Sequence, residues 1–261
     1  MENIASQISK MPLANYEKAY QYIIGLDYSD KEGIMFLEEQ LYNLLQQDAE
    51  NANLLALLMH EQIMNNKGQR ARSIAYKIWE DGGVLVPEIE RIYIDDLMNL
   101  YLIDMAGAAL MPIISDLENN IAQWSNLLIK YAIISGNMAL LERILSYLPD
   151  NNTYNILRDW CIFCEYLQAT EHMPNIMERI CKDVQDTILS FSFNLFFDRE
   201  FPEIEFVFYV SDEVRHKDDM RENMNLQISS YCSAKKIEDL INLSSSVLSI
   251  DRHPRMDTSI F

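Results

Sequence analysis

Residues 123–184 decide the fold. They read QWSNLLIKYAIISGNMALLERILSYLPD (123–150) and then NNTYNILRDWCIFCEYLQATEHMPNIMERICKDV (151–184). Each half has the pattern of a helix, a short break and a second helix, and Trp124 and Tyr154 open the two halves 30 residues apart. Recurrence at this spacing is typical of helical-repeat proteins, in which one helical hairpin cannot bury its own apolar face and packs on the next.

The same period extends in both directions. Further helical units are predicted to start near residues 53, 88 and 221, about 33 residues apart, and one more unit fits near 187. Glycine and proline number only 7 each, which disfavours a fold made of many turns and strands. We therefore predict an all-α fold, an α-α superhelix or solenoid of about six helical hairpins. It forms a single domain over 12–250, with flexible ends at 1–11 and 251–261.

Only the stretch 202–216 is ambiguous. It reads FVFY at its centre, which suits a strand, but acids at its start and Arg215-His216 at its end complement a helix dipole. We favour a helix, because an isolated strand here would have no obvious neighbour to pair with. Residues 185–200, 218–232 and 235–249 are also predicted to be helical.

The pattern resembles the tetratricopeptide-like superfamily. In the unit opened by Trp124 and in the 53–87 unit, the residues that match are Trp124, Leu127, Leu128, Tyr131, Gly136, Ile144 and Pro149, and Gly68, Ala75, Trp79 and Pro87. Leu128 and Leu140 stand where that repeat has small residues, so the resemblance is to the superfamily and not to the strict repeat. It implies a superhelix with a concave groove for a peptide, a helix or a protein.

Residues 121–160 also look pentatricopeptide-like. Members of that family bind single-stranded RNA, one base per repeat, and the resemblance would place Asn126 and Asn155 near the bases. RNA binding is therefore the alternative function for this chain.

The charge argues against nucleic acid. The net charge is −19, from 40 acidic and 21 basic residues, and the acids outnumber the bases in every part of the chain. Such a surface repels phosphate backbones and anionic lipids, and complements a basic protein partner. We find no secretory signal and no apolar run long enough for a transmembrane helix, so we expect a cytoplasmic protein.

Two short motifs in this chain are close to motifs that carry out redox or metal chemistry in other proteins. Cys161 and Cys164 in WCIFC have thioredoxin-like spacing, but they fall within a predicted helix, where we expect inert, free thiols. His60-Glu61 begins a sequence close to the zinc-protease helix, but Met64 replaces the second histidine. We therefore predict no metal and no cofactor.

The function that the sequence favours is non-catalytic. We expect an adaptor, scaffold or chaperone-like protein that holds a protein partner in its groove. An enzyme with an unrecognised site is a third reading, and the oligomeric state stays open. By superfamily analogy, the groove residues are Gln62, Asn65, Asn66, Ser125, Ile129, Asn155 and Asp159.

Overall fold

The structure is a computed structural model that describes residues 12–182, 186–196, 203–211, 213–236 and 243–250. Its elements in chain order are α2 (Tyr16–Ile23), α3 (Lys31–Leu45), α4 (Ala52–Met64), α5 (Gly68–Asp81), α6 (Pro87–Asn99), α7 (Ile103–Ser115), α8 (Leu117–Ile134), α9 (Met138–Tyr147), α10 (Asn152–Tyr166), the 3₁₀ helix η1 (Thr170–His172), α11 (Met173–Lys182), β1 (Ile188–Phe196), β2 (Glu203–Val210), α12 (Lys217–Lys235) and β3 (Leu243–Ser249). The ends expected to be flexible, 1–11 and 251–261, lie outside the described residues.

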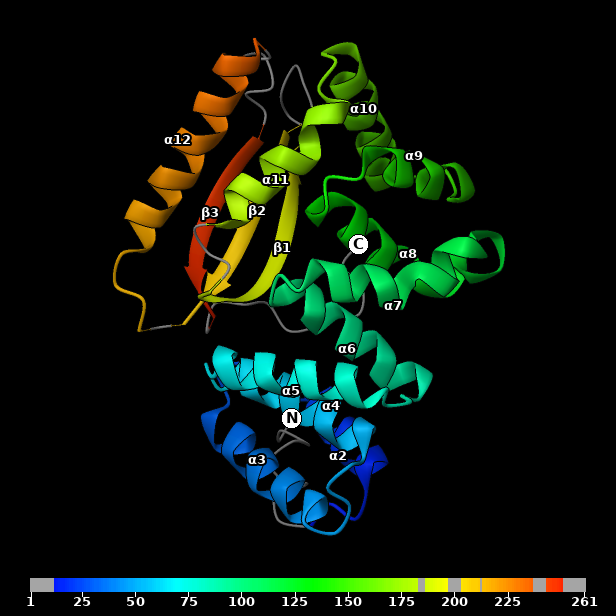
Figure 1. The fold of residues 1–261 in the computed structure, drawn as a ribbon, viewed down its shortest axis with the longest axis vertical. Coiled ribbons are helices and arrows are strands. Elements are labelled where there is room, and N and C mark those ends of the chain that lie inside the picture. The colour runs from blue at the N-terminus through cyan, green and yellow to red at the C-terminus, as the bar shows by residue number, and fades with distance from the viewer. Residues whose placement is uncertain (1–11, 183–185, 197–202, 212, 237–242, 251–261) are drawn as a thin grey trace, which may run out of the picture.

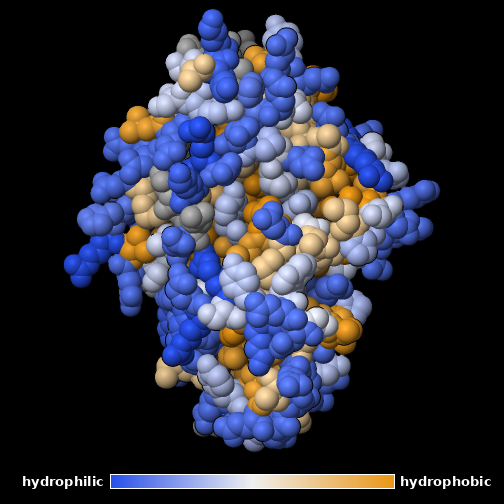
Figure 2. All heavy atoms as spheres, in the orientation of Figure 1, coloured by the Kyte–Doolittle hydropathy of each residue, from blue (hydrophilic) through white to orange (hydrophobic). Residues whose placement is uncertain are grey.

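Helices form most of the molecule, and successive helices pack on one another along the chain (Figure 1). Contacts also join α4 to α6 and α6 to α8, so the first helices of successive pairs lie side by side. One buried core extends from Ala19 to Ile250 and joins the helices to a small sheet. In Figure 2 apolar residues gather over α7–α9, whereas the α12 side is mostly hydrophilic. Among the described residues, no helix is long and apolar enough to cross a membrane.

One turn geometry recurs where α4, α6, α8 and α10 end. A residue just past each helix adopts a left-handed conformation: Asn66 (φ 59°), Tyr101 (φ 55°), Gly136 (φ 67°) and Gln168 (φ 55°). The next amide in each turn donates to a carbonyl five residues earlier, at 2.7 or 2.8 Å. This hydrogen bond is the one that closes a Schellman motif. The turns are 35, 35 and 32 residues apart, so the same way of ending a helix recurs at a nearly constant spacing.

Only one of the four turns requires glycine. A Cβ at Gly136 would lie 2.5 Å from backbone atoms of Met173 and Pro174, because the start of α11 packs directly on this turn. Positive φ and close approach both favour glycine here. Gly68, one of the residues that match the tetratricopeptide-like pattern, begins α5, and Asn66 adopts the left-handed conformation in the turn before it.

Three strands form a sheet of order β1-β2-β3. β1 and β2 pair antiparallel, and β2 and β3 pair parallel across the connection that contains α12. α12 packs on β3 and on α11 (Figure 1). The central strand β2 is buried along nearly its whole length, which suits its run of aromatic and β-branched residues.

The all-α prediction is therefore wrong in the C-terminal third, although a mostly helical protein is confirmed. The predicted helices in 185–200, 202–216 and 235–249 contain β1, β2 and β3, and only the one at 218–232 exists, as α12. β2 was misjudged because it was taken to be isolated. Its two neighbours supply the pairing that the argument from the sequence denied it.

The outer edge of β1 is closed by polar side chains from the helices. Oδ1 of Asn99, the last residue of α6, accepts hydrogen bonds from the Phe191 amide at 3.1 Å and from Ser190 Oγ at 3.3 Å. Arg72 of α5 donates to the Leu100 carbonyl at 3.1 Å and to the Ile188 carbonyl at 3.5 Å. Because these groups satisfy backbone atoms that a sheet edge would leave unpaired, the strand can be buried against α4 and α6.

We predict that Asn99→Ala lowers the free energy of unfolding by about 3 kcal/mol, because it leaves buried donors without an acceptor. Denaturant unfolding at neutral pH measures the change. Asn119→Ala is the matched control, because Asn119 lies on α8, is exposed and bonds only an exposed aspartate. A substitution of that kind changes stability by about 0.5 kcal/mol or less. Equal stabilities for the two variants would contradict the role given to Asn99.

Candidate functional site

The groove residues expected from the sequence do not form one surface. Gln62 and Ile129 are fully buried. Asn65, Asn66 and Ser125 are partly buried, whereas Asn155 and Asp159 are exposed. Gln62 and Asn65 bond Glu38 of the neighbouring helix α3, and β1 packs on α4 and α6, so part of the face on which these residues were placed is covered by the chain itself.

A buried polar cluster lies beneath that contact. Lys130 of α8 donates to Asp95 Oδ1 at 2.6 Å and to Asn99 Oδ1 at 2.7 Å, and Asn99 Nδ2 donates to Asp95 Oδ2 at 3.0 Å. Asn99 Oδ1 thus accepts hydrogen bonds from Lys130 and from two donors of β1. This cluster joins α6, α8 and β1, and its hydrogen bonds fix their positions.

His60 is also structural in this arrangement. Its Nδ1 lies 3.0 Å from both carboxylate oxygens of Asp96, and both side chains are buried. Burial alone would lower the pKa of His60, but the Asp96 carboxylate more than offsets it, so the pKa is raised. Met64, which replaces the second histidine of a zinc-protease helix, is buried in the core. Among the described residues, no group of three or more His, Cys, Asp or Glu side chains is placed to hold a metal ion.

The cysteines of WCIFC lie within α10, as the sequence predicts. All four cysteines of the chain are free and buried. Burial raises the pKa of Cys164 to about 12, so its thiolate is scarce at neutral pH. A catalytic cysteine needs the opposite shift, because the thiolate is the nucleophile.

Two carboxylates share their donors next to the α4–α5 turn. Glu38 of α3 accepts from Gln62 at 3.1 Å and from Asn65 at 3.2 Å, and Lys67 donates to it at 2.7 Å. Glu61 accepts from the same Gln62 and Asn65 side-chain amides. Burial raises the pKa of Glu61 to about 7, partly offset by the bond from Gln62 and reinforced by the Glu38 charge.

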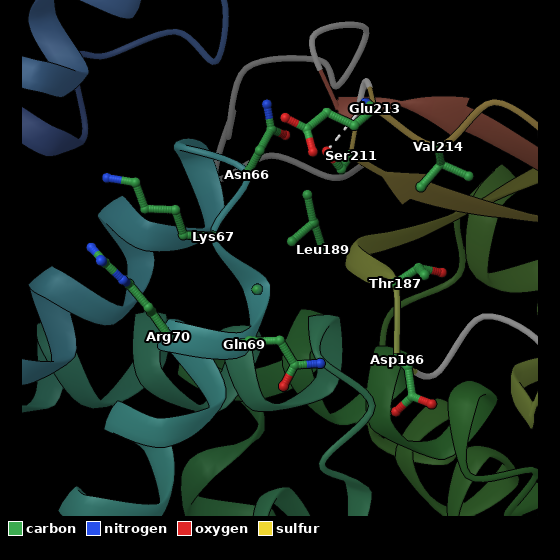
Figure 3. Close-up of a pocket in the computed structure, with 11 residues that line it drawn as sticks. Asn66, Lys67, Gln69, Arg70, Asp186, Thr187, Leu189, Ser211, Glu213 and Val214 are labelled. Atoms are coloured by element: carbon green, nitrogen blue, oxygen red, sulfur yellow. Dashed lines mark hydrogen bonds between the residues drawn. The ribbon is translucent and has the colours of Figure 1, made fainter.

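The same turn forms one wall of a pocket of about 550 Å³. Its lining residues are Asn66, Lys67, Gly68, Gln69 and Arg70 from the turn and the start of α5, Asp186, Thr187 and Leu189 around the start of β1, and Ser211, Glu213 and Val214 after β2. In Figure 3 Leu189 lies centrally, and Asn66 and Glu213 approach each other above it. Lys67 and Arg70 extend away from Leu189, on the outer side of the turn.

The pocket therefore combines an apolar floor with polar walls of both charge signs. Val214 supplies partly exposed apolar surface, and Leu189 lies almost fully buried in the floor. Asp186 and Glu213 supply exposed carboxylates. Asn66 Oδ1 is buried and has no hydrogen-bond partner among the described residues. Of the seven residues nominated from the sequence, only Asn66 lines this pocket. The lining residues at the start of β1 and after β2 could not be recognised from the sequence. They reach the α4–α5 turn only because β1 pairs with β2 and packs on the helices.

Comparison with protein-family models, curated proteins and solved structures found no match for this chain.

We predict that Glu61→Gln makes stability less dependent on pH. The native pKa of about 7 exceeds the usual 4.5, so between these values the folded protein binds a proton that the unfolded chain has lost. Wild-type stability should therefore fall as pH rises from about 4.5 to 7, by about 3 kcal/mol at most. In Glu61→Gln, stability should not show this decrease between about pH 4.5 and pH 7, because glutamine does not titrate.

Denaturant unfolding of both proteins at pH 5 and pH 8 measures the effect. Glu39→Gln is the control, since Glu39 lies on the neighbouring helix α3 and is exposed. If the free energies of unfolding of Glu61→Gln and Glu39→Gln both change between pH 5 and pH 8 as that of the wild type does, Glu61 is not the titrating group.

Proposed function

We propose that this protein is a non-catalytic adaptor that binds a segment of a protein partner in the pocket between the α4–α5 turn and the sheet. The observation that carries the proposal is the lining of that pocket. A peptide presents N–H donors, carbonyl acceptors and side chains of mixed character, and these complement carboxylates, amides and an apolar floor.

The helical part supports a scaffold role. Similar left-handed turns at 66, 101, 136 and 168 are what a degenerate helical-repeat array of the tetratricopeptide-like kind would have. In such arrays the groove usually holds the partner. Here the packing of β1 on α4 and α6 moves the accessible site from the groove to the turn beside it.

The partner should carry positive charge. Asp186 and Glu213 lie in the pocket, and the chain as a whole has a charge of −19. This field speeds association with a basic segment at low salt and opposes a phosphate backbone. Two lining cations against two lining acids give no excess of positive charge for RNA, which disfavours the pentatricopeptide-like alternative.

Ser211 and Thr187 line the pocket, but its lining includes neither a cysteine nor a histidine that could serve as nucleophile or activate a hydroxyl. This lining favours binding over nucleophilic catalysis in the pocket. Free thiols also suit a reducing compartment such as the cytoplasm.

The test uses peptides of about 12 residues selected from a random displayed library on the immobilised full chain. We expect basic peptides whose affinity falls roughly tenfold or more when Gln69→Trp fills the pocket with an indole. Gln69 is exposed, so the variant should fold normally. Gln47→Trp, at another exposed glutamine, is the control and should bind as the wild type does.

Peptides that bind Gln69→Trp and wild type equally would contradict binding at the pocket. A gel shift with pooled single-stranded RNA completes the test. Submicromolar RNA binding that Gln69→Trp abolishes would replace the adaptor proposal with RNA binding.

A further inference from the structure

Helix α7 is almost uncharged although one side of it is exposed. Its sequence, IDMAGAALMPIIS, contains Asp104 and no other charged residue. A helix that is apolar all round is normally buried on every side. Here Leu110 and Ile113 are buried on one side, whereas Met111, on the opposite side, is 58% exposed. The exposed side of α7 therefore lacks the charged residues that usually face water.

Four residues form this exposed side: Ala108, Met111, Pro112 and Ser115. They follow one another at spacings of three and four residues, so they make one row along the helix. With thirteen residues, α7 is about 20 Å long. Figure 2 shows apolar surface along α7, where single exposed apolar residues would be unremarkable but a continuous row is a candidate interface.

Pro112 adds a hydrogen-bond acceptor to the same side. It lies inside α7, and proline has no N–H to donate to the carbonyl four residues earlier. The carbonyl of Ala108 therefore lacks the donor that closes an α-helical turn. Ala108 and Pro112 are both exposed, which leaves this acceptor at the surface within the apolar row.

Negative charge flanks the row at both ends. Asp104 lies at the start of α7, Asp116 and Glu118 follow its end, and all three are exposed. Lys130 is the sole cation in α7 and α8, and it is buried against Asp95 at 2.6 Å. A partner that covers the row therefore meets acidic residues at its two ends and no accessible base on these helices.

We propose that the exposed side of α7 binds an amphipathic helix of a protein partner. The apolar stripe of that helix covers Met111, and lysine or arginine residues beside the stripe meet Asp104 and Glu118. Side-chain rows of one helix fit the grooves of another at interaxial distances of about 8–10 Å, and helix recognition uses apolar residues at these spacings. A basic side chain can also donate to the Ala108 carbonyl.

The charge of this chain favours such a partner over the other occupants of an apolar face. A second copy also carries a charge of −19, and an anionic lipid surface is repelled in the same way. None of the residues that line the pocket belongs to α7, so this surface lies apart from the pocket and does not depend on the function proposed for it.

The experiment measures binding of helical peptides of about 18 residues to the full chain. The peptides come from a displayed library with varied apolar residues at i, i+3, i+4 and i+7, flanked either by lysines or by glutamates. We expect the lysine-flanked peptides to bind roughly tenfold or more tightly than the glutamate-flanked ones. Gln69→Trp, which fills the pocket, should leave their affinity unchanged, so the two proposals fail independently.

A charge in the middle of the row tests the site itself. Met111→Glu should weaken the lysine-flanked peptides roughly tenfold or more, because it places a carboxylate against their apolar stripe. Met35→Glu is the matched control, since Met35 lies on α3 and is 65% exposed, and it should bind as the wild type does. Equal affinities for the two variants would overturn the proposal.

Two further variants do not rely on Met111→Glu being folded. Asp104→Asn with Glu118→Gln should slow association and make it less dependent on salt. Glu39→Gln with Glu50→Gln removes two exposed charges elsewhere and should change neither. An association rate and a salt dependence that are the same in both double variants would contradict recognition of a basic helix.

Pro112→Ala tests the free carbonyl. Alanine favours a helix and restores the N–H that Ala108 lacks, so the variant should fold. We expect the affinity to fall roughly fivefold, as for the loss of one hydrogen bond. An unchanged affinity would overturn the bond assigned to the Ala108 carbonyl.

Two other outcomes would assign the α7 surface to a different occupant. Sedimentation of the wild type as a dimer that Met111→Glu converts to monomers would show a second copy there. Binding to phosphatidylcholine vesicles, with or without phosphatidylserine, that Met111→Glu abolishes would show a lipid surface. Either result would overturn the proposal.

Discussion

The fold depends on one amide oxygen. Asn99 Oδ1, at the end of α6, accepts hydrogen bonds from the Lys130 ammonium, the Phe191 amide and the Ser190 hydroxyl. An edge strand cannot be buried against helices while its backbone groups lack partners, since each unsatisfied group costs about 1–3 kcal/mol. A single polar residue at the α6 C-terminus thus makes the junction between helices and sheet possible. Lys130 and Asp95 hold that residue in place, and their charges compensate each other at 2.6 Å.

Packing of α4 between α3 and α6 accounts for the unusual polarity of the interior. Gln62, His60, Glu61 and Asp96 are all buried, although their residue types usually favour solvent. In an open helical array, residues at such positions would line a groove and contact water. Here they are paired with one another, and the Glu61 carboxyl has its pKa raised to about 7 because water is excluded. These polar residues, which would line a groove in an open array, are part of the core in this protein.

Features of this fold that depend on residues close together in the sequence could be predicted, whereas those that depend on distant residues could not. The helices through residue 182 arise from local periodicity and capping, and their presence was readable in the sequence. Gly136 was recognisable as a turn residue for the same reason. The strands were missed because pairing joins residues that are far apart, such as Phe208 and Val247. Within residues 188–196, apolar and polar residues alternate in Phe191-Ser192-Phe193-Asn194, which is a strand pattern. The prediction of a helix there gave more weight to the spacing of the helical units. The pocket could not be predicted, because Asn66 and Glu213 meet only after the sheet has packed on the α4–α5 turn.

The serines of β3 join the third strand to its neighbours. Ser245 donates to Asn225, Ser246 donates to Glu205 on β2, and Ser249 accepts from Lys217 at 2.6 Å. These side-chain bonds hold β3 against α12 and β2, and Ser245 is almost fully buried there. Each of the three hydroxyls has a partner on α12 or β2, as polar groups packed inside a fold require. The serines therefore do for β3 what Asn99 does for β1: they let a polar stretch of strand pack against a helix.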